Sequence, residues 1–230
     1  MSTTSIEKEI VHQESVSMGN LEAQQEQTKS LFPVPQTTAL AEFQKTLIGP
    51  AIGFASFGLC SFVLGIYNAG IVTNLPQVAT GVAISYGALG QYTAAIIEIV
   101  HKNTFAAASF FTFASFFLAF GIMMIPGAGF LGPAAAAGEL EMCMGLIEIA
   151  YSFAAFIFFL GTFRQPILVR MILGLSTLSF LFPALGAFTG IIALAKIGGW
   201  LSFTLALVAW YALAAMIYNE TNTFIRVPFF

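Results

Sequence analysis

The sequence predicts an all-α integral membrane protein, a bundle of six transmembrane helices with a disordered N-terminal tail. Six apolar stretches fill residues 47–219 almost without interruption, and each has about the 20 residues that one helical crossing of a bilayer needs. Only 8% of the residues are charged, whereas a soluble domain carries about 25%. The stretches show no period-2 alternation, which favours a helical bundle over a membrane β-barrel.

Residues 1–46 differ in kind from the rest of the chain. Their first part is rich in Glu, Gln, Ser and Thr and cannot bury enough apolar surface to offset the entropy of ordering, so we expect a disordered cytoplasmic tail. It lacks the basic region and apolar run of a secretory signal peptide. Leu40, Phe43 and Leu47 recur at helical spacing, so residues 39–46 form either a short interfacial helix or the continuous start of the first span.

Apolar run length places the six spans of the membrane domain along the chain. They are expected at residues 47–67, 77–99, 104–125, 140–162, 167–189 and 198–218. With the tail in the cytoplasm, seven basic residues share its side: Lys8, Lys29, Lys45, Lys102, Arg164, Arg170 and Arg226. Only Lys196 falls on the other side. This excess predicts that both termini, including a short tail at 220–230, face the cytoplasm.

Chemistry-bearing side chains are scarce in these spans. His12 lies in the tail, His101 lies in a loop, and the chain contains no Asp. Without a paired nucleophile and base or a cluster of metal ligands, we expect no enzyme activity, metal or cofactor. No basic patch indicates nucleic-acid binding. Cys60 and Cys143 fall inside or beside apolar spans, and we expect buried free thiols rather than a disulfide.

A few carboxylates lie within or beside the spans, where an unpartnered charge is costly. Glu98 precedes Lys102 by four residues at the cytoplasmic end of the second span, so the two form either an interfacial ion pair or part of a pore entrance. Glu148 lies inside the fourth span, with Glu141 one heptad earlier on the same face. This stripe indicates a hydrated vestibule, a subunit interface or a protonatable coupling site.

Glycines suggest where the helices meet and where one span ends. Gly49 and Gly53 are four residues apart, as are Gly186 and Gly190, a spacing that lets helix backbones approach closely in a membrane. Residues 132–138 read GPAAAAG, and their Pro and Gly residues predict a loop on the non-cytoplasmic face.

Several motifs resemble one transporter family. Residues 87–105 read GALGQYTAAIIEIVHKNTF, which resembles the pattern GGxxQxxAGxxExxxGNTF of the acetate uptake transporter family, a family that includes succinate–acetate permeases. Further matches follow in register, namely Asn68-Ala69-Gly70, Gly161-Thr162-Phe163-Arg164, Gly199-Trp200-Leu201, Ala209-Trp210-Tyr211 and Asn219-Glu220. The resemblance covers residues 47–228. The family signature NPAPLGL aligns with residues 48–54, where Gly53 is kept and the leading Asn is lost.

The resemblance implies a permease or anion channel in the plasma membrane, assembled as a homo-hexamer. Its implied substrates are acetate and related short carboxylates, including succinate, propionate and lactate, carried with or without protons. Family members have a narrow apolar constriction of Phe, Tyr and Leu. By register, the Phe falls on Phe57, the Tyr position holds Phe113, and the Leu position falls on Ser176 or, with a one-residue slip, on Leu175.

Polar side chains in the spans are candidates for the substrate path. They are Ser61, Asn68, Gln91, Thr104 and Thr112, each of which could instead bond within the bundle. Candidates for proton coupling are Glu148 and Glu98.

Two other functions stay open. The chain could export ammonia or ammonium through an apolar pore, or it could be a non-transporting scaffold or sensor whose tail recruits partners after phosphorylation.

Overall fold

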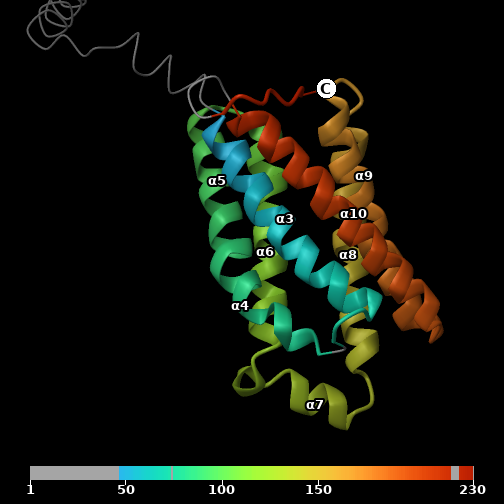
Figure 1. Ribbon diagram of the computed structural model, residues 1–230. Helices are drawn as coiled ribbons and strands as arrows, with labels where there is room; N and C mark the ends of the chain where they lie inside the picture. Colours follow the sequence, from blue (N-terminus) through green and yellow to red (C-terminus); the bar gives the residue numbers. More distant parts are fainter. Residues whose placement is uncertain (1–46, 74, 219–222, 230) are drawn as a thin grey trace, which may run out of the picture. The chain divides into compact units, whose positions relative to one another are not determined.

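The computed structural model describes residues 47–73, 75–218 and 223–229, and these form helices joined by turns (Figure 1). The predicted tail at residues 1–46, with its possible interfacial helix at 39–46, lies outside the described residues. The all-α fold class is confirmed for the described part of the chain.

In the described part of the chain, five helices are long and apolar enough to cross a bilayer. They are α3 (Ile48–Ala69), α6 (Thr104–Met123), α8 (Leu140–Leu160), α9 (Ile167–Thr189) and α10 (Ile192–Ile217). Each lies within a few residues of a predicted span, because apolar run length fixes where a helix can enter and leave lipid.

The second predicted span is also helical, but not as one regular α-helix. It consists of a 3₁₀ turn (Pro76–Ala79), α4 (Thr80–Val82), a π-helical stretch (Ala83–Ala88) and α5 (Leu89–Val100). These four pieces follow one another without a gap. The described residues therefore form five uninterrupted helices of spanning length rather than the six predicted, and one irregular helical run takes the place of the second predicted span.

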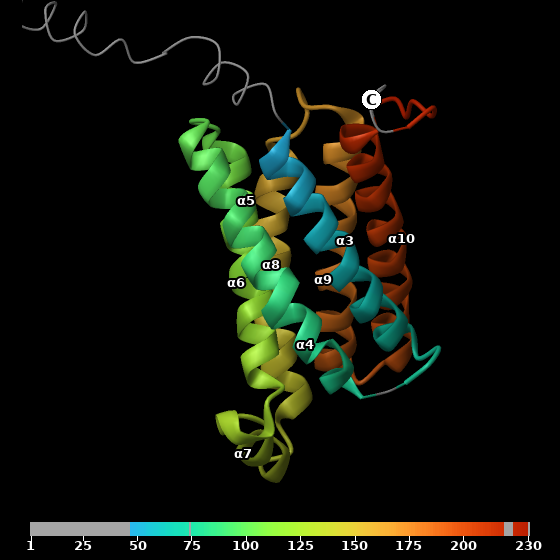
Figure 2. The same ribbon diagram turned by 60° about the vertical axis from the view of Figure 1, so that its left-hand side comes forward.

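The long helices stand side by side as a bundle (Figures 1 and 2). Helix α3 packs along α10 and α5, α10 packs along α9, and α9 packs along α8, while α6 packs against α5 and the π-helical stretch. The helices thus surround a shared interior, in the order α6, α5, α3, α10, α9 and α8. The start of α3 and residues 223–229 lie at one end of the bundle, and α7 (Leu131–Ala136) lies at the other (Figure 1).

Two predicted boundaries are wrong. Helix α10 begins at Ile192 rather than at residue 198, because Lys196 is exposed and a long lysine side chain can reach water from within a helix end. The predicted loop at 132–138 contains α7, since its run of alanines has the best intrinsic helix propensity. Gly138 then ends this helical segment with φ 71°.

Glycines set the closest helix contacts. A Cβ on Gly199 of α10 would collide with the backbone nitrogen of Ala69 in α3, and a Cβ on Gly65 would meet the backbone of Phe203. The predicted pair in α3 also faces neighbours, since Gly49 contacts the Glu98 side chain. The backbones of α3 and α10 therefore approach most closely at Gly65 and Gly199. Neither glycine belongs to the two predicted pairs.

The predicted glycine pair of α9 does not act as one packing surface. A Cβ on Gly186 would meet the backbone of Ala195 in α10. Gly190 instead ends α9 in the left-handed region, with φ 72°, and has open space around it. A C-terminal glycine of this kind satisfies the last carbonyl groups of a helix.

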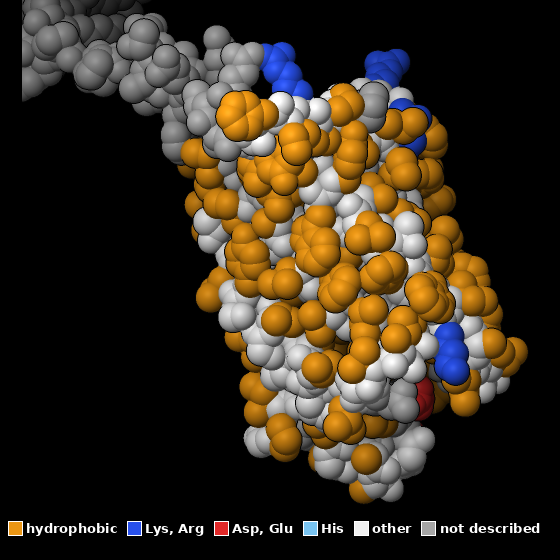
Figure 3. Space-filling model, viewed as in Figure 1, with side chains coloured by type: hydrophobic (Ala, Val, Ile, Leu, Met, Phe, Trp, Pro, Cys, Tyr) orange, Lys and Arg blue, Asp and Glu red, His pale blue; other side chains and the backbone are white. Residues whose placement is uncertain are grey.

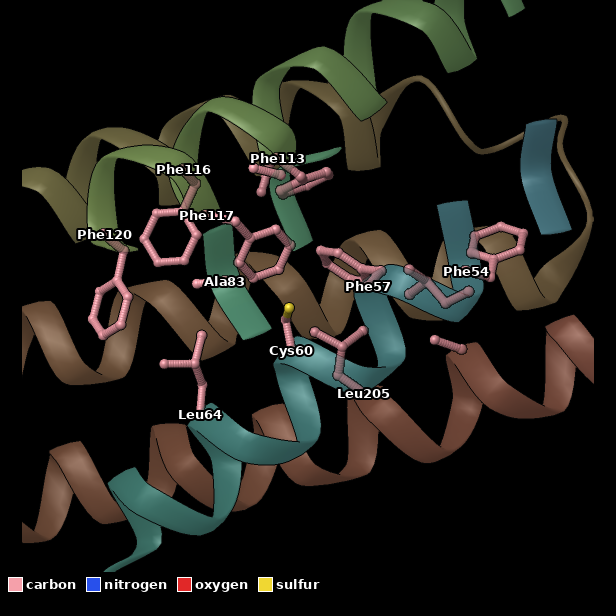
Figure 4. Packing of buried hydrophobic residues seen from close by; sticks show 14 of the residues in the cluster. Phe54, Phe57, Cys60, Leu64, Ala83, Phe113, Phe116, Phe117, Phe120 and Leu205 are labelled. Carbon is pink, nitrogen blue, oxygen red and sulfur yellow. The ribbon is translucent and has the colours of Figure 1, made fainter. Parts of the chain in front are cut away.

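Aromatic side chains fill the centre of the bundle, as Figure 4 shows for the phenylalanines of α3 and α6. Both cysteines are free thiols, as predicted, but only Cys60 is buried, whereas Cys143 is partly exposed. Cys60 is fully buried, and its Sγ donates to the carbonyl oxygen of Val82 at 3.3 Å. Apolar side chains also cover much of the outer face in Figure 3, as expected of a surface that faces lipid.

Candidate functional site

Two cavities lie inside the bundle. Cavity 1 has a volume of about 230 Å³ and is lined from α3, α5, α6, α9, α10 and Phe229. Cavity 2 has a volume of about 70 Å³ and is lined from α3, α6, α8, α9 and α10. Phe57 is the residue that lines both cavities.

One face of α3 connects the two cavities. Its lining residues are Pro50, Phe54, Phe57, Ser61, Leu64, Tyr67 and Asn68. From Pro50 to Tyr67 they recur every three or four residues, and Asn68 adjoins the last of them, so they form one stripe along the helix. At 1.5 Å per residue the stripe is about 27 Å long, close to the roughly 30 Å thickness of a bilayer core. Figure 4 shows part of this face, with Phe54, Phe57 and Leu64 pointing into the bundle.

Aromatic rings separate the cavities. The Phe57 ring lies 5.0 Å from the Phe113 ring and 5.8 Å from the Phe117 ring, measured between centroids. Phe57 and Phe113 are each only 4% exposed. These two residues, placed at a constriction by the family register, are therefore in direct contact.

The third predicted position does not reach the cavities. Ser176 is fully buried and donates to the carbonyl oxygen of Ile172 at 2.7 Å, and neither Ser176 nor Leu175 lines either cavity. Phe180, one helical turn further along α9, lines cavity 2 and stacks on Phe113 at 6.4 Å. Sequence reasoning missed Phe180. The i, i+4 spacing from Ser176 was the available signal, because it places both residues on one face.

Gln91 supplies an amide to the wall of cavity 1. Its Nε2 donates to the carbonyl oxygen of Gly53 at 2.5 Å and to Ser56 Oγ at 3.1 Å. Gln91 is fully buried, and no donor in the described part of the chain reaches its Oε1. This side chain therefore joins the irregular second helical run to α3 and leaves one acceptor without a partner.

Glu98 is held at the end of α5. Its carboxylate accepts from Asn103 Nδ2 at 2.6 Å and lies 3.3 Å from His101 Nδ1. The predicted ion pair with Lys102 is wrong, because α5 ends at Val100 and Lys102 has φ 57°. The helical i, i+4 geometry therefore does not apply. Glu98 lines neither cavity.

Polar groups from four helices meet in cavity 2, among them Ser202 of α10. Ser61 and Asn68 come from α3, Glu148 from α8 and Ser179 from α9. Glu141, predicted on the same stripe as Glu148, is exposed and does not line this cavity. One helix face thus brings a single carboxylate to the cavity rather than two.

The two threonine candidates lie away from the cavities. Thr104 is exposed in the first turn of α6, and Thr112 donates to the carbonyl oxygen of Ala108 at 2.9 Å. Neither lines cavity 1 or cavity 2. Within the described ranges, no group of three His, Cys or Glu residues is placed to hold a metal ion.

Known proteins share this architecture. The sequence model of the GPR1/FUN34/yaaH family matches residues 35–230. The chain belongs to this family. Membership confirms the resemblance that the motifs indicate. The bacterial acetate channel SatP superposes with a TM-score of 0.68 at 22% identity, over 79% of this chain and 98% of that one, so the family fold is shared.

Family members with related sequences carry several names. The chain is 32% identical over 183 residues to ammonia transport outward protein 2 of Saccharomyces cerevisiae, covering 77% of this chain and 64% of that protein. It is 27% identical over 190 residues to acetate permease A of Emericella nidulans, covering 77% and 63%. It is 28% identical over 176 residues to the succinate-acetate/proton symporter SatP of Escherichia coli, covering 76% and 90%. The chain spans just under two thirds of the two fungal relatives.

Proposed function

We propose that this family member is a membrane permease or channel for acetate and related short carboxylates, among them succinate, propionate and lactate. The observation that carries the proposal is the pair of cavities along one face of α3, which meet at the buried ring of Phe57. The names of acetate permease A and of the succinate-acetate/proton symporter SatP support this substrate class.

The lining suits passage better than tight binding. A carboxylate that crossed hydrocarbon alone would pay a large cost of desolvation, and polar groups at intervals lower that cost. Ser61, Asn68 and Gln91 lie along the two cavities. Sites that bind weakly release their solute readily, as conduction requires. No catalytic step enters this proposal.

The membrane topology follows from the helical run between Pro76 and Val100. At 1.5 Å per residue, this run is long enough to cross a bilayer core of roughly 30 Å, and we propose it as the second of six crossings. An even number of crossings agrees with the position of residues 223–229 at the end of the bundle where α3 begins (Figure 1).

Charge supports a cytoplasmic assignment for that end. Lys102 follows α5, and Arg164 lies between α8 and α9, so both belong to the end where α3 begins. Lys and Arg side chains gather at the upper end of the face in Figure 3. By the positive-inside rule we assign this end, with residues 1–46 and 220–230, to the cytoplasmic side of the plasma membrane.

The proposed assembly is a homo-hexamer, as the family resemblance implies. Helix α8 supports it with an apolar face that the described part of this chain leaves uncovered. Leu146, Phe153 and Ile157 lie on this face and are 65%, 65% and 68% exposed. Neighbouring subunits or lipid would cover them.

Export of ammonia or ammonium is the second candidate function. Cavity 2 favours it, because Glu148, Phe116 and Phe120 all line this cavity, and a carboxylate together with aromatic faces attracts a small cation. The name of the yeast relative points the same way. The scaffold hypothesis depends on residues 1–46, which lie outside the described residues.

Uptake of labelled acetate into liposomes that hold the purified protein tests the proposal. We expect saturable acetate uptake above that of empty liposomes. Uptake measured with and without a proton gradient shows whether acetate flux is coupled to protons. Competition by ammonium separates the two candidate solutes. If folded and correctly oriented protein takes up no acetate but passes ammonium, ammonium export replaces acetate transport as the proposed function.

A further inference from the structure

Cavity 1 presents a hydrogen-bond acceptor that nothing in the described part of the chain satisfies. Gln91 Oε1 has no donor within reach, although the Gln91 side chain is fully buried in the cavity wall. The orientation of the amide is fixed by its other end. Nε2 lies 2.5 Å from the carbonyl oxygen of Gly53, which can only accept, so the nitrogen must face α3 and the oxygen must be the free atom.

Among the described residues that line cavity 1, Ser109 is the other buried polar side chain, and its hydroxyl has already used its one donor. Asn103 Nδ2 donates to Glu98 Oε2 at 2.6 Å, and Ser109 Oγ donates to the carbonyl oxygen of Ala106 at 3.0 Å. Asn103 and Gln165 also line the cavity, but both are exposed. Among the described residues that line cavity 1, none carries a formal charge.

Such a lining discriminates between the two forms of a carboxylic acid. The anion has only acceptor oxygens and would meet the Gln91 oxygen without a donor between them, in an apolar cavity that compensates charge poorly. The neutral acid brings its own O–H donor. A buried acceptor that gains a donor recovers the cost of its missing hydrogen bond.

We propose that cavity 1 admits short carboxylic acids in their protonated form, with the acid O–H donating to Gln91 Oε1. This inference rests on the proposed carboxylate permease function and specifies the form of the solute. Each molecule then carries its own proton through cavity 1, so transport moves no net charge. An uncharged solute with N–H donors, such as acetamide or ammonia, fits the same acceptor.

Voltage is the first test. Labelled acetate is added outside liposomes that hold the wild-type protein, and a potassium diffusion potential of either sign is imposed across their membrane. Uptake of the neutral acid is expected to be the same at both signs, whereas uptake of the anion would follow the potential. Voltage-driven uptake would overturn the proposal while leaving the permease function intact, and would point instead to an anion site at the N-terminus of α9, where Pro166 and Val169 line cavity 1.

An uncharged isostere provides the second test. Acetamide has the shape of acetic acid and carries N–H donors at every pH. Its inhibition of labelled acetate uptake is expected to be constant from mildly acidic to mildly alkaline pH. Inhibition by unlabelled acetate is expected to weaken by about tenfold for each pH unit, in step with the protonated fraction. Inhibition that depends only on total acetate would contradict the proposal.

Variants locate the acceptor. Gln91→Met keeps the length of the side chain but removes Oε1, and it is expected to weaken inhibition by acetamide about tenfold, the usual effect of one hydrogen bond. Ser56→Ala removes the hydroxyl that Nε2 reaches and keeps Oε1 and its Gly53 anchor, so it is expected to bind acetamide as the wild type does. Equal loss in both variants would assign the effect to helix packing and overturn the role of Oε1. If Gln91→Met does not fold, the voltage and acetamide results on the wild type still decide.

Discussion

Phe57 contacts both cavities, so the size of its side chain determines how widely they are joined. Phe57→Ala removes a ring that packs on Phe113 at 5.0 Å and should open a continuous passage. We expect uptake of propionate and lactate to rise relative to acetate, and the free energy of unfolding to fall by about 3 kcal/mol.

A second phenylalanine of α3 provides the control for this prediction. Phe62 packs on Phe203 and Trp210, with centroids 5.5 Å and 5.3 Å away, and lines neither cavity. Phe62→Ala should lower stability without changing substrate preference. The same change in preference in both variants would place the constriction elsewhere.

The single carboxylate of cavity 2 gives the next prediction. An ionised Glu148 repels a carboxylate anion at close range, which favours passage of the neutral acid. Glu148→Gln removes that charge and keeps the shape. We therefore expect a proton gradient to accumulate less acetate in the variant, because the anion can leak, while exchange of labelled for unlabelled acetate persists.

Glu141 is the matched control for this carboxylate. It lies on the same helix but is exposed and outside cavity 2, so Glu141→Gln should accumulate acetate as the wild type does. Accumulation that Glu148→Gln leaves unchanged would remove this residue from the coupling mechanism.

Side-chain volume limits how well single residues can be predicted. Register with the family pairs Phe57 with Phe113, and the structure brings these two rings into contact across α3 and α6. At the third position the serine is too small to reach the cavities, and Phe180, one turn away, lies there instead. A sequence pattern fixes which face of a helix a residue occupies, but the neighbour that fills a gap depends on packing in three dimensions.

At the scale of whole helices, the backbone contact between α3 and α10 determines stability. Gly199→Ala places a methyl group against the backbone of Ala69, which cannot yield as a flexible side chain would. We expect the free energy of unfolding to fall by about 2 kcal/mol, measured by thermal unfolding in detergent. Gly81→Ala, in α4 with open space around it, should be neutral or slightly stabilising.

Residues 223–229 form a segment at the mouth of cavity 1. Phe229 lines that cavity, and Tyr211 Oη donates to the carbonyl oxygen of Pro228 at 3.1 Å. Phe229→Ala should therefore speed modification of a cysteine introduced at Ser109, which lines cavity 1. The reaction of a small thiol reagent with this cysteine, in protein that also carries Cys143→Ser, measures access.

The control for this segment is the fully exposed Phe224. Phe224→Ala should leave the modification rate unchanged, because its ring contacts no cavity. Faster modification in both variants would mean that the segment as a whole, and not the Phe229 ring, limits access.

Hydrophobicity predicts elements better than it predicts their regularity. Run length placed every long helix, since the bilayer fixes the number of apolar residues that a crossing needs. The irregular second run escaped prediction because its cause is tertiary. A Cβ on Gly87 would lie 2.6 Å from Cys60 Sγ, and the same thiol donates to the carbonyl oxygen of Val82. Contacts across 20 or more positions of sequence leave no local signal.

For the whole molecule, the number of membrane crossings determines on which side of the membrane each basic residue lies. A sixth crossing at Pro76–Val100 returns the chain to the end where α3 begins, and the basic residues then collect at that end. A chain with only the five regular crossings would instead place Lys102, Arg164, Arg170 and Arg226 on the side opposite Lys8, Lys29, Lys45 and Lys196. The excess of basic residues on one side would then disappear. Topology and charge thus depend on whether this one irregular run crosses the membrane.

Cysteine labelling on either side of that run tests the topology directly. Leu75 precedes the run, Lys102 follows it, and Lys196 lies near the start of α10; all three are exposed. In a Cys143→Ser background with Cys60 fully buried, a membrane-impermeant maleimide should label Leu75→Cys and Lys196→Cys in intact cells. It should label Lys102→Cys only after permeabilisation, because six crossings put that position in the cytoplasm. Equal labelling of the Leu75 and Lys102 positions in intact cells would mean that the run does not cross, and the excess of basic residues would then need another cause.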